Sequence, residues 1–132
     1  MAHIVSFHSG KFDVSAETPN PINPIAGQSV LAWLRAELAK AHYTATEPDA
    51  EDWGWYIDVT GNDNSYLVGA SADADGSTAD VEWVVQIHKH RSFRDKVFGR
   101  NKMAANDPVV ALIERIVRAE PQIFEVSVDR EV

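Results

Sequence analysis

The sequence predicts one α+β domain spanning residues 1–132, with a single antiparallel sheet of five to six strands and two main helices packed on one face. Stretches in which apolar and polar residues alternate, as in half-buried strands, occur near the start, in the middle and at the end of the chain. Two other stretches carry apolar residues at helical spacing. The expected order of elements is ββ-α-βββ-α-β.

The first third of the chain is expected to form a hairpin and a helix. Residues 3–15 alternate on both sides of Ser9-Gly10, which suits a two-residue turn. The proline-rich residues 19–24 cannot continue a helix or a central strand, so they are expected to form an extended connector. A helix from Gly27 or Gln28 to Ala41 is predicted by one apolar stripe. The stripe consists of Val30, Leu31, Leu34, Leu38 and Ala41.

The centre of the chain is expected to form a meander of three strands after an acidic loop at residues 47–52. The strands are expected at residues 53–59, 66–71 and 81–87, with a turn at residues 61–64. The alternating residues expected to face the core are Trp53, Trp55, Ile57, Val59, Val81, Trp83, Val85 and Ile87.

The last third is expected to contain a short helix, a main helix and a closing strand. The short helix is expected at residues 93–98. Asp107 is a suitable cap for the main helix, and Pro108 suits its first position. Pro121 ends that helix, and residues 123–128 form the closing strand.

The charges are unevenly distributed. The net charge is −8, and ten carboxylates lie at residues 47–82, within a stretch that has no Lys or Arg from residue 41 to 87. Half of the twelve basic residues then follow at residues 89–102. We therefore expect a dipolar molecule that binds no nucleic acid and associates with a protein partner or with itself through its charged faces.

Composition also bears on location and cofactors. The chain has no cysteine, which excludes disulfides and thiolate metal sites. No signal peptide or stretch of about 20 apolar residues is seen, so a cytoplasmic protein without membrane contact is expected. No cofactor motif is found, and no cofactor is expected.

The sheet face opposite the helices is a candidate binding surface. Tyr56 and Asp58 are expected there, and His88 and His90 lie on one side of a strand end with Glu82. The two imidazoles with a carboxylate are either ligands for zinc or nickel or ordinary surface histidines.

The loop from Ser71 to Glu82 partly matches a calcium-binding loop. Asp73, Asp75 and Glu82 fall at ligand positions of such a loop. However, Ser71 stands where the first carboxylate is usual, and Thr78 stands where an apolar residue is usual. We expect a solvated loop and no metal, with these three carboxylates as the candidate ligands.

The basic segment is the second candidate binding surface. Arg91, Arg94 and Arg100 supply bidentate donors for a phosphate group, an acidic partner or the acidic face of a second copy. The alternative is a solvated loop.

Two stretches resemble a group of small bacterial proteins without an assigned activity. They are residues 51–56 (Glu-Asp-Trp-Gly-Trp-Tyr) and residues 23–27 (Asn-Pro-Ile-Ala-Gly). The resemblance implies a compact α+β domain in the bacterial cytosol and carries over no catalytic residues. In size, acidity and architecture the chain is also similar to the acidic immunity proteins that neutralise bacterial toxins.

These observations lead to an expected function. A small, non-enzymatic, cytosolic binding protein acting through a polarised charged surface, such as an inhibitor, fits the charge distribution and the lack of catalytic motifs. The alternative is a small-ligand-binding protein or an enzyme that uses the sheet face with His88 and His90.

Overall fold

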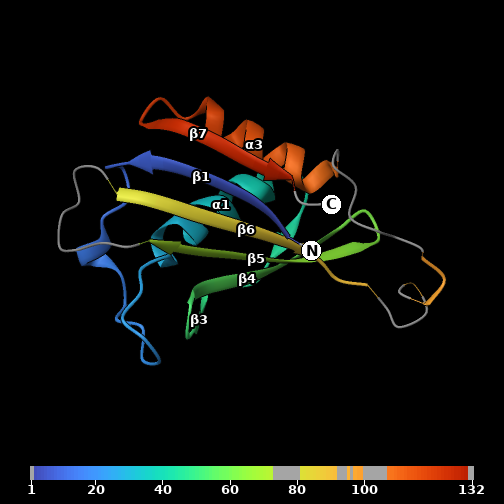
Figure 1. Ribbon diagram of the computed structural model, residues 1–132, viewed down its shortest axis with the longest axis horizontal. Helices are drawn as coiled ribbons and strands as arrows, with labels where there is room; N and C mark the ends of the chain where they lie inside the picture. Colours follow the sequence, from blue (N-terminus) through green and yellow to red (C-terminus); the bar gives the residue numbers. More distant parts are fainter. Residues whose placement is uncertain (1, 73–80, 92–94, 96, 100–106, 131–132) are drawn as a thin grey trace.

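The computed structural model has one antiparallel sheet with two helices packed on one face, which confirms the predicted fold class (Figure 1). It describes residues 2–72, 81–91, 95, 97–99 and 107–130. The strand order is β2-β4-β5-β6-β1-β7, and β3 also pairs with β4. The elements are β1 (Ala2–Ser9), the 3-10 helix η1 (Val14–Ala16), α1 (Gln28–Lys40), β2 (Thr44–Ala45), β3 (Asp49–Glu51), β4 (Gly54–Gly61), β5 (Asn64–Ala72), β6 (Val81–Lys89), α3 (Pro108–Ala119) and β7 (Ile123–Arg130).

The first strand lies inside the sheet, and the hairpin predicted for residues 3–15 is wrong. Val5 of β1 lies opposite Val85 of β6 on one side and Val128 of β7 on the other. Because both edges of β1 are paired, no edge is left for a second strand after Ser9. The chain instead forms η1, and Phe12 is buried in the core.

The predicted acidic loop at residues 47–52 contains a short strand. β3 pairs antiparallel with the first residues of β4, so the two form a hairpin with a turn at Asp52 and Trp53. The turn predicted between the next two strands is confirmed. Asn62 and Asp63 there have φ of 52° and 62°, the left-handed conformation of a type I′ hairpin.

Both predicted main helices are present, and their caps have different origins. At α3, Asp107 Oδ1 accepts a hydrogen bond from Val109 N at 2.9 Å, as the sequence predicts. The N-terminus of α1 is capped from a distance. Glu17 in the segment after η1 accepts hydrogen bonds from the backbone N–H groups of Gln28 and Ser29.

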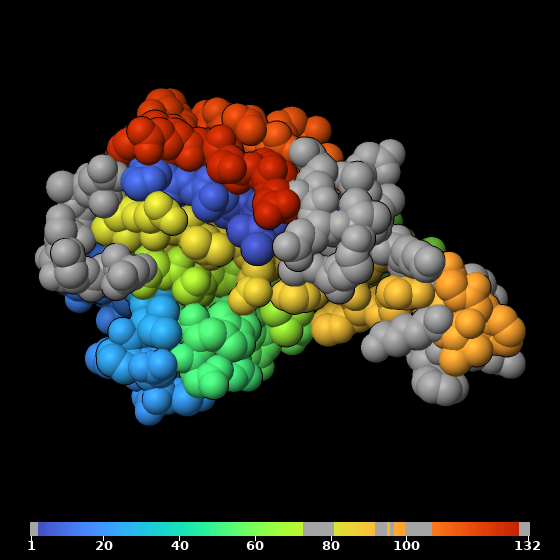
Figure 2. Space-filling view, viewed as in Figure 1, coloured from blue at the N-terminus to red at the C-terminus, as the bar shows by residue number. Residues whose placement is uncertain are grey.

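The core lies between the sheet and the two helices. Its strand residues include Val5, Phe7, Ile57, Trp83 and Ile87, all fully buried. The apolar stripes of α1 and α3 cover them. Since both helices use the same face of the sheet, the strands lie in view on the other face (Figure 2).

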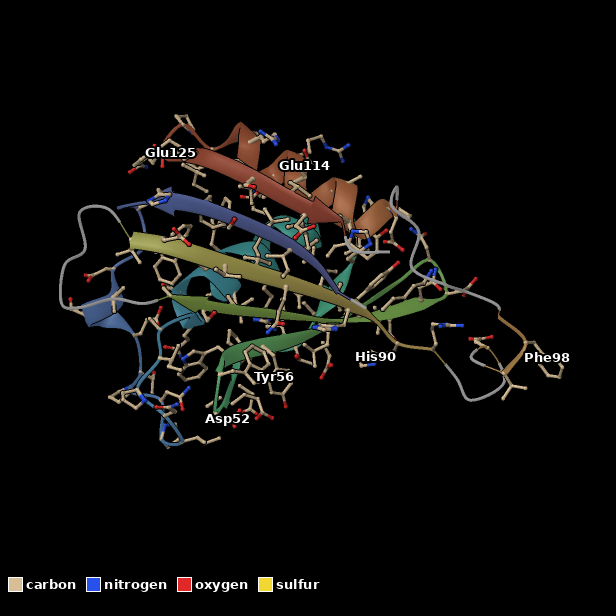
Figure 3. The ribbon with its side chains drawn as sticks, viewed as in Figure 1. Asp52, Tyr56, His90, Phe98, Glu114 and Glu125 are labelled. Carbon is tan, nitrogen blue, oxygen red and sulfur yellow. The ribbon has the colours of Figure 1, made fainter. Side chains whose placement is uncertain are left out.

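Of the residues after β6, the structure describes 90–91, 95 and 97–99. The short helix predicted at residues 93–98 falls largely outside the described residues. Phe98 lies far from the body of the molecule (Figure 3), and its side chain is 67% exposed. Within the described part of the chain, the helices are too short or too polar to span a membrane.

Candidate functional site

The sheet face opposite α1 and α3 carries most of the predicted site residues that the structure describes, and we name it the open face. In β4, Trp55, Ile57 and Val59 are buried against the helices, so Tyr56 and Asp58 point the other way. In β6 the same alternation puts Glu82, Val84, Gln86 and His88 on the open face. β1 adds Ile4, Ser6 and His8, and β5 adds Leu67, Gly69 and Ser71.

One edge of the open face is acidic. We define the acidic edge as Asp49, Glu51, Asp52 and Asp58, which lie on β3, β4 and the turn between them. Tyr56 lies opposite Asp49 in the β3–β4 pair. The Asp49 carboxylate raises the pKa of the Tyr56 phenol, and burial, Asp58 and Glu51 raise it further. The negative charges of this edge therefore act together on Tyr56.

His90 lies at the opposite end of the open face from the β3–β4 turn (Figure 3), and His88 lies opposite Leu67 of β5, which in turn pairs with Asp58. His88 Nε2 is 3.2 Å from Gln86 Oε1, and burial lowers the pKa of His88, as does nearby positive charge that includes His90. His90 Nε2 is 3.7 Å from Asp58 Oδ1. Asp58 thus joins the acidic edge to the histidines, while a neutral His88 adds no charge at neutral pH.

Trp53 is on the open face, and its predicted place in the core is wrong. It belongs to the β3–β4 turn and not to β4, and the following Gly54 has a φ of 150°. This turn breaks the alternation that would have directed Trp53 inward. Its ring covers Gly69, where an added Cβ would lie only 2.4 Å from Trp53 Cη2.

A second group of charged residues lies around Glu82, at the N-terminal end of β6. His8 Nε2 is 3.3 Å from Glu82 Oε2 and 3.4 Å from Glu125 Oε2, and the His8 ring stacks on Phe124 at 5.9 Å. Glu82, one of the predicted calcium ligands, thus pairs with a histidine. Asp73 and Asp75, the other two, lie outside the described residues.

No metal centre forms among the described residues: nowhere in residues 2–72, 81–91 and 107–130 do three His, Asp or Glu side chains lie in position to hold an ion. His88 contacts an amide and His90 a single carboxylate. The structure therefore does not bring the two predicted imidazoles together with Glu82.

The predicted basic segment is only partly described. Arg94 and Arg100 lie outside the described residues. Arg91 donates a hydrogen bond from Nη2 to the carbonyl oxygen of Asp95 at 3.1 Å. Lys89 is directed to the helix side of the sheet, where it lies 3.5 Å from the buried Asp107 carboxylate. Lys89 therefore lies at the edge of the hydrophobic core, and it does not belong to the basic surface.

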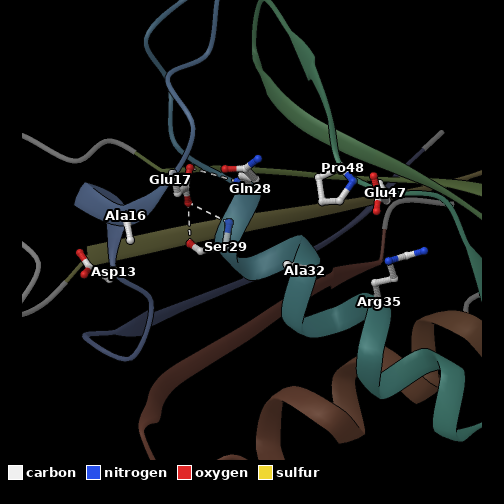
Figure 4. A pocket seen from close by; sticks show the side chains of 9 residues that line it. All are labelled: Asp13, Ala16, Glu17, Gln28, Ser29, Ala32, Arg35, Glu47 and Pro48. Carbon is white, nitrogen blue, oxygen red and sulfur yellow. Dashed lines mark hydrogen bonds between the residues drawn. The ribbon is translucent and has the colours of Figure 1, made fainter.

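A pocket of about 500 Å³ lies at the N-terminus of α1 (Figure 4). Its polar groups already serve the fold. The Glu17 carboxylate accepts hydrogen bonds from Ser29 N and Ser29 Oγ at 2.9 and 2.5 Å, and Arg35 Nε donates to Ala45 O at 3.0 Å. A carboxylate at a helix N-terminus occupies the position an anionic ligand would take. This pocket is therefore a poor anion site.

Comparisons with protein-family models, curated proteins and solved structures found no match to this chain. The open face must therefore be interpreted from its own chemistry. It combines an acidic edge with the exposed sides of two aromatic residues, Trp53 and Tyr56.

The field of the acidic edge can be measured at Tyr56. Replacing Asp49 with asparagine is expected to lower the Tyr56 pKa, because the largest cause of its elevation is removed. Because the Tyr56 pKa is higher in the folded chain than in the unfolded one, the fold gains stability below the ordinary tyrosine pKa of about 10 and loses that stability as the pH rises through the folded-state pKa. The free energy of unfolding should therefore fall less steeply with alkaline pH in the variant than in the wild type. NMR titration of the Tyr56 ring, which is resolved from Tyr43 and Tyr66, measures the pKa. Asp129→Asn, four strands away, is the control, and equal shifts in both variants would contradict the assignment.

Proposed function

We propose that this chain is a small, non-enzymatic, cytoplasmic binding protein whose open face receives a basic surface of another protein. The observation that carries the proposal is the position of the acidic edge beside a sheet face that neither α1 nor α3 covers. Aromatic side chains supply contact area there, and carboxylates supply attraction and orientation for a partner rich in Lys and Arg. Inhibition of a basic enzyme, as by an immunity protein, is the concrete form of this function.

Charge complementarity supports a basic partner over an acidic or neutral one. The acidic edge lies within residues 41–87, where the sequence has no Lys or Arg. The raised pKa of Tyr56 indicates that negative potential persists at the open face. Such potential speeds the capture of an oppositely charged protein and weakens as salt is added.

The test is capture from a bacterial lysate at low salt, followed by kinetics with the purified partner. We compare the wild type with the triple variant Asp49→Asn, Asp52→Asn, Asp58→Asn. The control variant Glu37→Gln, Glu114→Gln, Glu120→Gln loses the same charge from the helix side of the molecule. Association with the partner should slow by at least about tenfold in the triple variant and little in the control.

Three results would contradict the proposal. One is a partner that associates equally fast with both triple variants. Another is an association rate that does not change with salt, since steering by exposed charges is screened. The third is recovery of only the chain itself, with light scattering showing a salt-dependent oligomer, which would favour self-association.

A further inference from the structure

A second, smaller pocket lies beside the open face, and we name it the anchor pocket. It has a volume of about 340 Å³ and lies between the connector, the β3–β4 turn and the end of β5. Its lining residues are Val14, Pro24, Ile25, Ala26, Trp53, Ser71 and Ala72. All but Ser71 have mainly apolar side chains, and polar atoms also line the pocket, so it suits an apolar group with polar contacts around it.

The connector wall of the pocket is fastened to the β3–β4 turn by two asparagine side chains. Asn20 Nδ2 donates to Glu51 O at 3.0 Å and to Gly54 O at 2.9 Å. Asn23 Nδ2 donates to Asp52 O at 2.8 Å. These bonds hold the proline-rich connector against the turn that carries Trp53.

The floor of the pocket is fixed by the sheet. Trp55 Nε1 donates to Ile25 O at 3.1 Å, and Ala72 N donates to Ala26 O at 3.0 Å. A pocket whose walls are already fixed loses little conformational entropy when it is filled, which favours binding.

Trp53 forms the wall shared by the pocket and the open face. The absence of a side chain at Gly69 lets the Trp53 ring lie directly on the sheet, because a Cβ there would come within 2.4 Å of Cη2. Glu51 and Asp52 precede Trp53 in the chain and belong to the acidic edge. An apolar group in the pocket would therefore lie near two residues of the acidic edge, although neither of them lines the pocket itself.

We infer that the anchor pocket receives one large apolar side chain, aromatic or branched aliphatic, from a Lys- or Arg-rich segment of the partner. The inference rests on the proposed function and adds a sequence requirement to it. Buried aromatic anchors surrounded by polar contacts carry much of the energy at protein interfaces. The acidic edge then selects basic neighbours on both sides of the anchor.

The experiment uses two blocked pentapeptides as probes, Lys-Lys-Phe-Lys-Lys and Lys-Lys-Ala-Lys-Lys. Binding to the whole chain and to each variant is measured by isothermal titration calorimetry, and NMR at the Trp53 indole, assigned with a Trp53→Phe variant, locates the site in the wild type. The phenylalanine peptide is expected to bind at least about tenfold more tightly, as burial of one phenyl group implies. Ser71→Phe, which fills the pocket, and Trp53→Ala, which removes a wall, should each abolish this difference.

Ser127→Phe is the control, because it adds the same side chain to the open face on β7, away from the pocket. It should keep the preference for the phenylalanine peptide. Equal affinity of the wild type for both peptides would overturn the anchor pocket. If the variant neutralised at Asp49, Asp52 and Asp58 then binds both more weakly, the proposed basic partner stands. A wild type that binds neither peptide contradicts both proposals.

Discussion

Replacing Asp107 with alanine is expected to lower the free energy of unfolding by about 3–5 kcal/mol, because it leaves a buried charge without its partner. The Asp107 side chain is only 2% exposed, and Lys89 Nζ lies 3.5 Å away on a side chain that is 9% exposed. Asp107 also accepts hydrogen bonds from Tyr66 Oη and Val109 N. Urea denaturation followed by circular dichroism measures the loss.

A double-mutant cycle separates the charge from the helix cap. Asp107→Asn keeps a capping oxygen and removes only the charge, so it leaves Lys89 unpaired. Adding Lys89→Met should restore much of the lost stability, since an apolar side chain can replace a buried ion pair at little cost. If the effects of the two single changes simply add, the two charges do not interact, and the explanation is wrong.

Replacing Trp83 with alanine is expected to cost about 3–5 kcal/mol, through lost burial and the cavity left behind. Trp83 is fully buried, and its ring meets Phe12 edge-on with centroids 5.6 Å apart. The Phe12 ring in turn packs against the Trp33 ring, with the two ring centroids 5.3 Å apart. The substitution removes the support beneath the loop that follows β1.

Trp33 provides the matched comparison for Trp83. It belongs to the same aromatic group but is only half-buried, so Trp33→Ala should cost clearly less. Circular dichroism in urea is suited to both variants, because neither loses the backbone signal. A Trp83→Ala protein that unfolds at the same denaturant concentration as Trp33→Ala would contradict the packing described here.

Local features of the sequence were sufficient to predict much of the fold. Asp107 and Pro108 define the start of α3, and Asn62 and Asp63 form the turn between β4 and β5, because caps and tight turns depend on neighbouring residues. The alternation in β4 likewise places Tyr56 opposite the helices. Features of this kind require no knowledge of distant parts of the chain.

The predictions failed where distant residues decide the structure. Phe12 alternates with its neighbours as a strand residue would, but β6 and β7 already occupy both sides of β1. Trp53 continues an alternating pattern in the sequence, but it lies in the turn before Gly54, and the turn points its side chain to the open face. Lys89 resembles the other members of a basic segment, and only the fold brings it to Asp107.

The anchor pocket was missed for the same reason. Asn20 and Asn23 appear in the sequence as ordinary residues of a proline-rich connector, and Gly69 as a glycine within a strand. Their roles depend on contacts with the β3–β4 turn. A glycine inside a strand indicates the close approach of another group, so Gly69 is the sequence feature that could have predicted this contact.

The interior position of β1 affects how the protein is made. β1 leaves the ribosome before both of its neighbours in the sheet, residues 81–89 and 123–130. Its pairing with β7 must wait until residues 123–130 emerge, and contacts so distant in sequence slow folding. Until those strands emerge, the apolar side of β1, including Val5 and Phe7, remains uncovered, which makes nascent chains of this protein expected clients of chaperones.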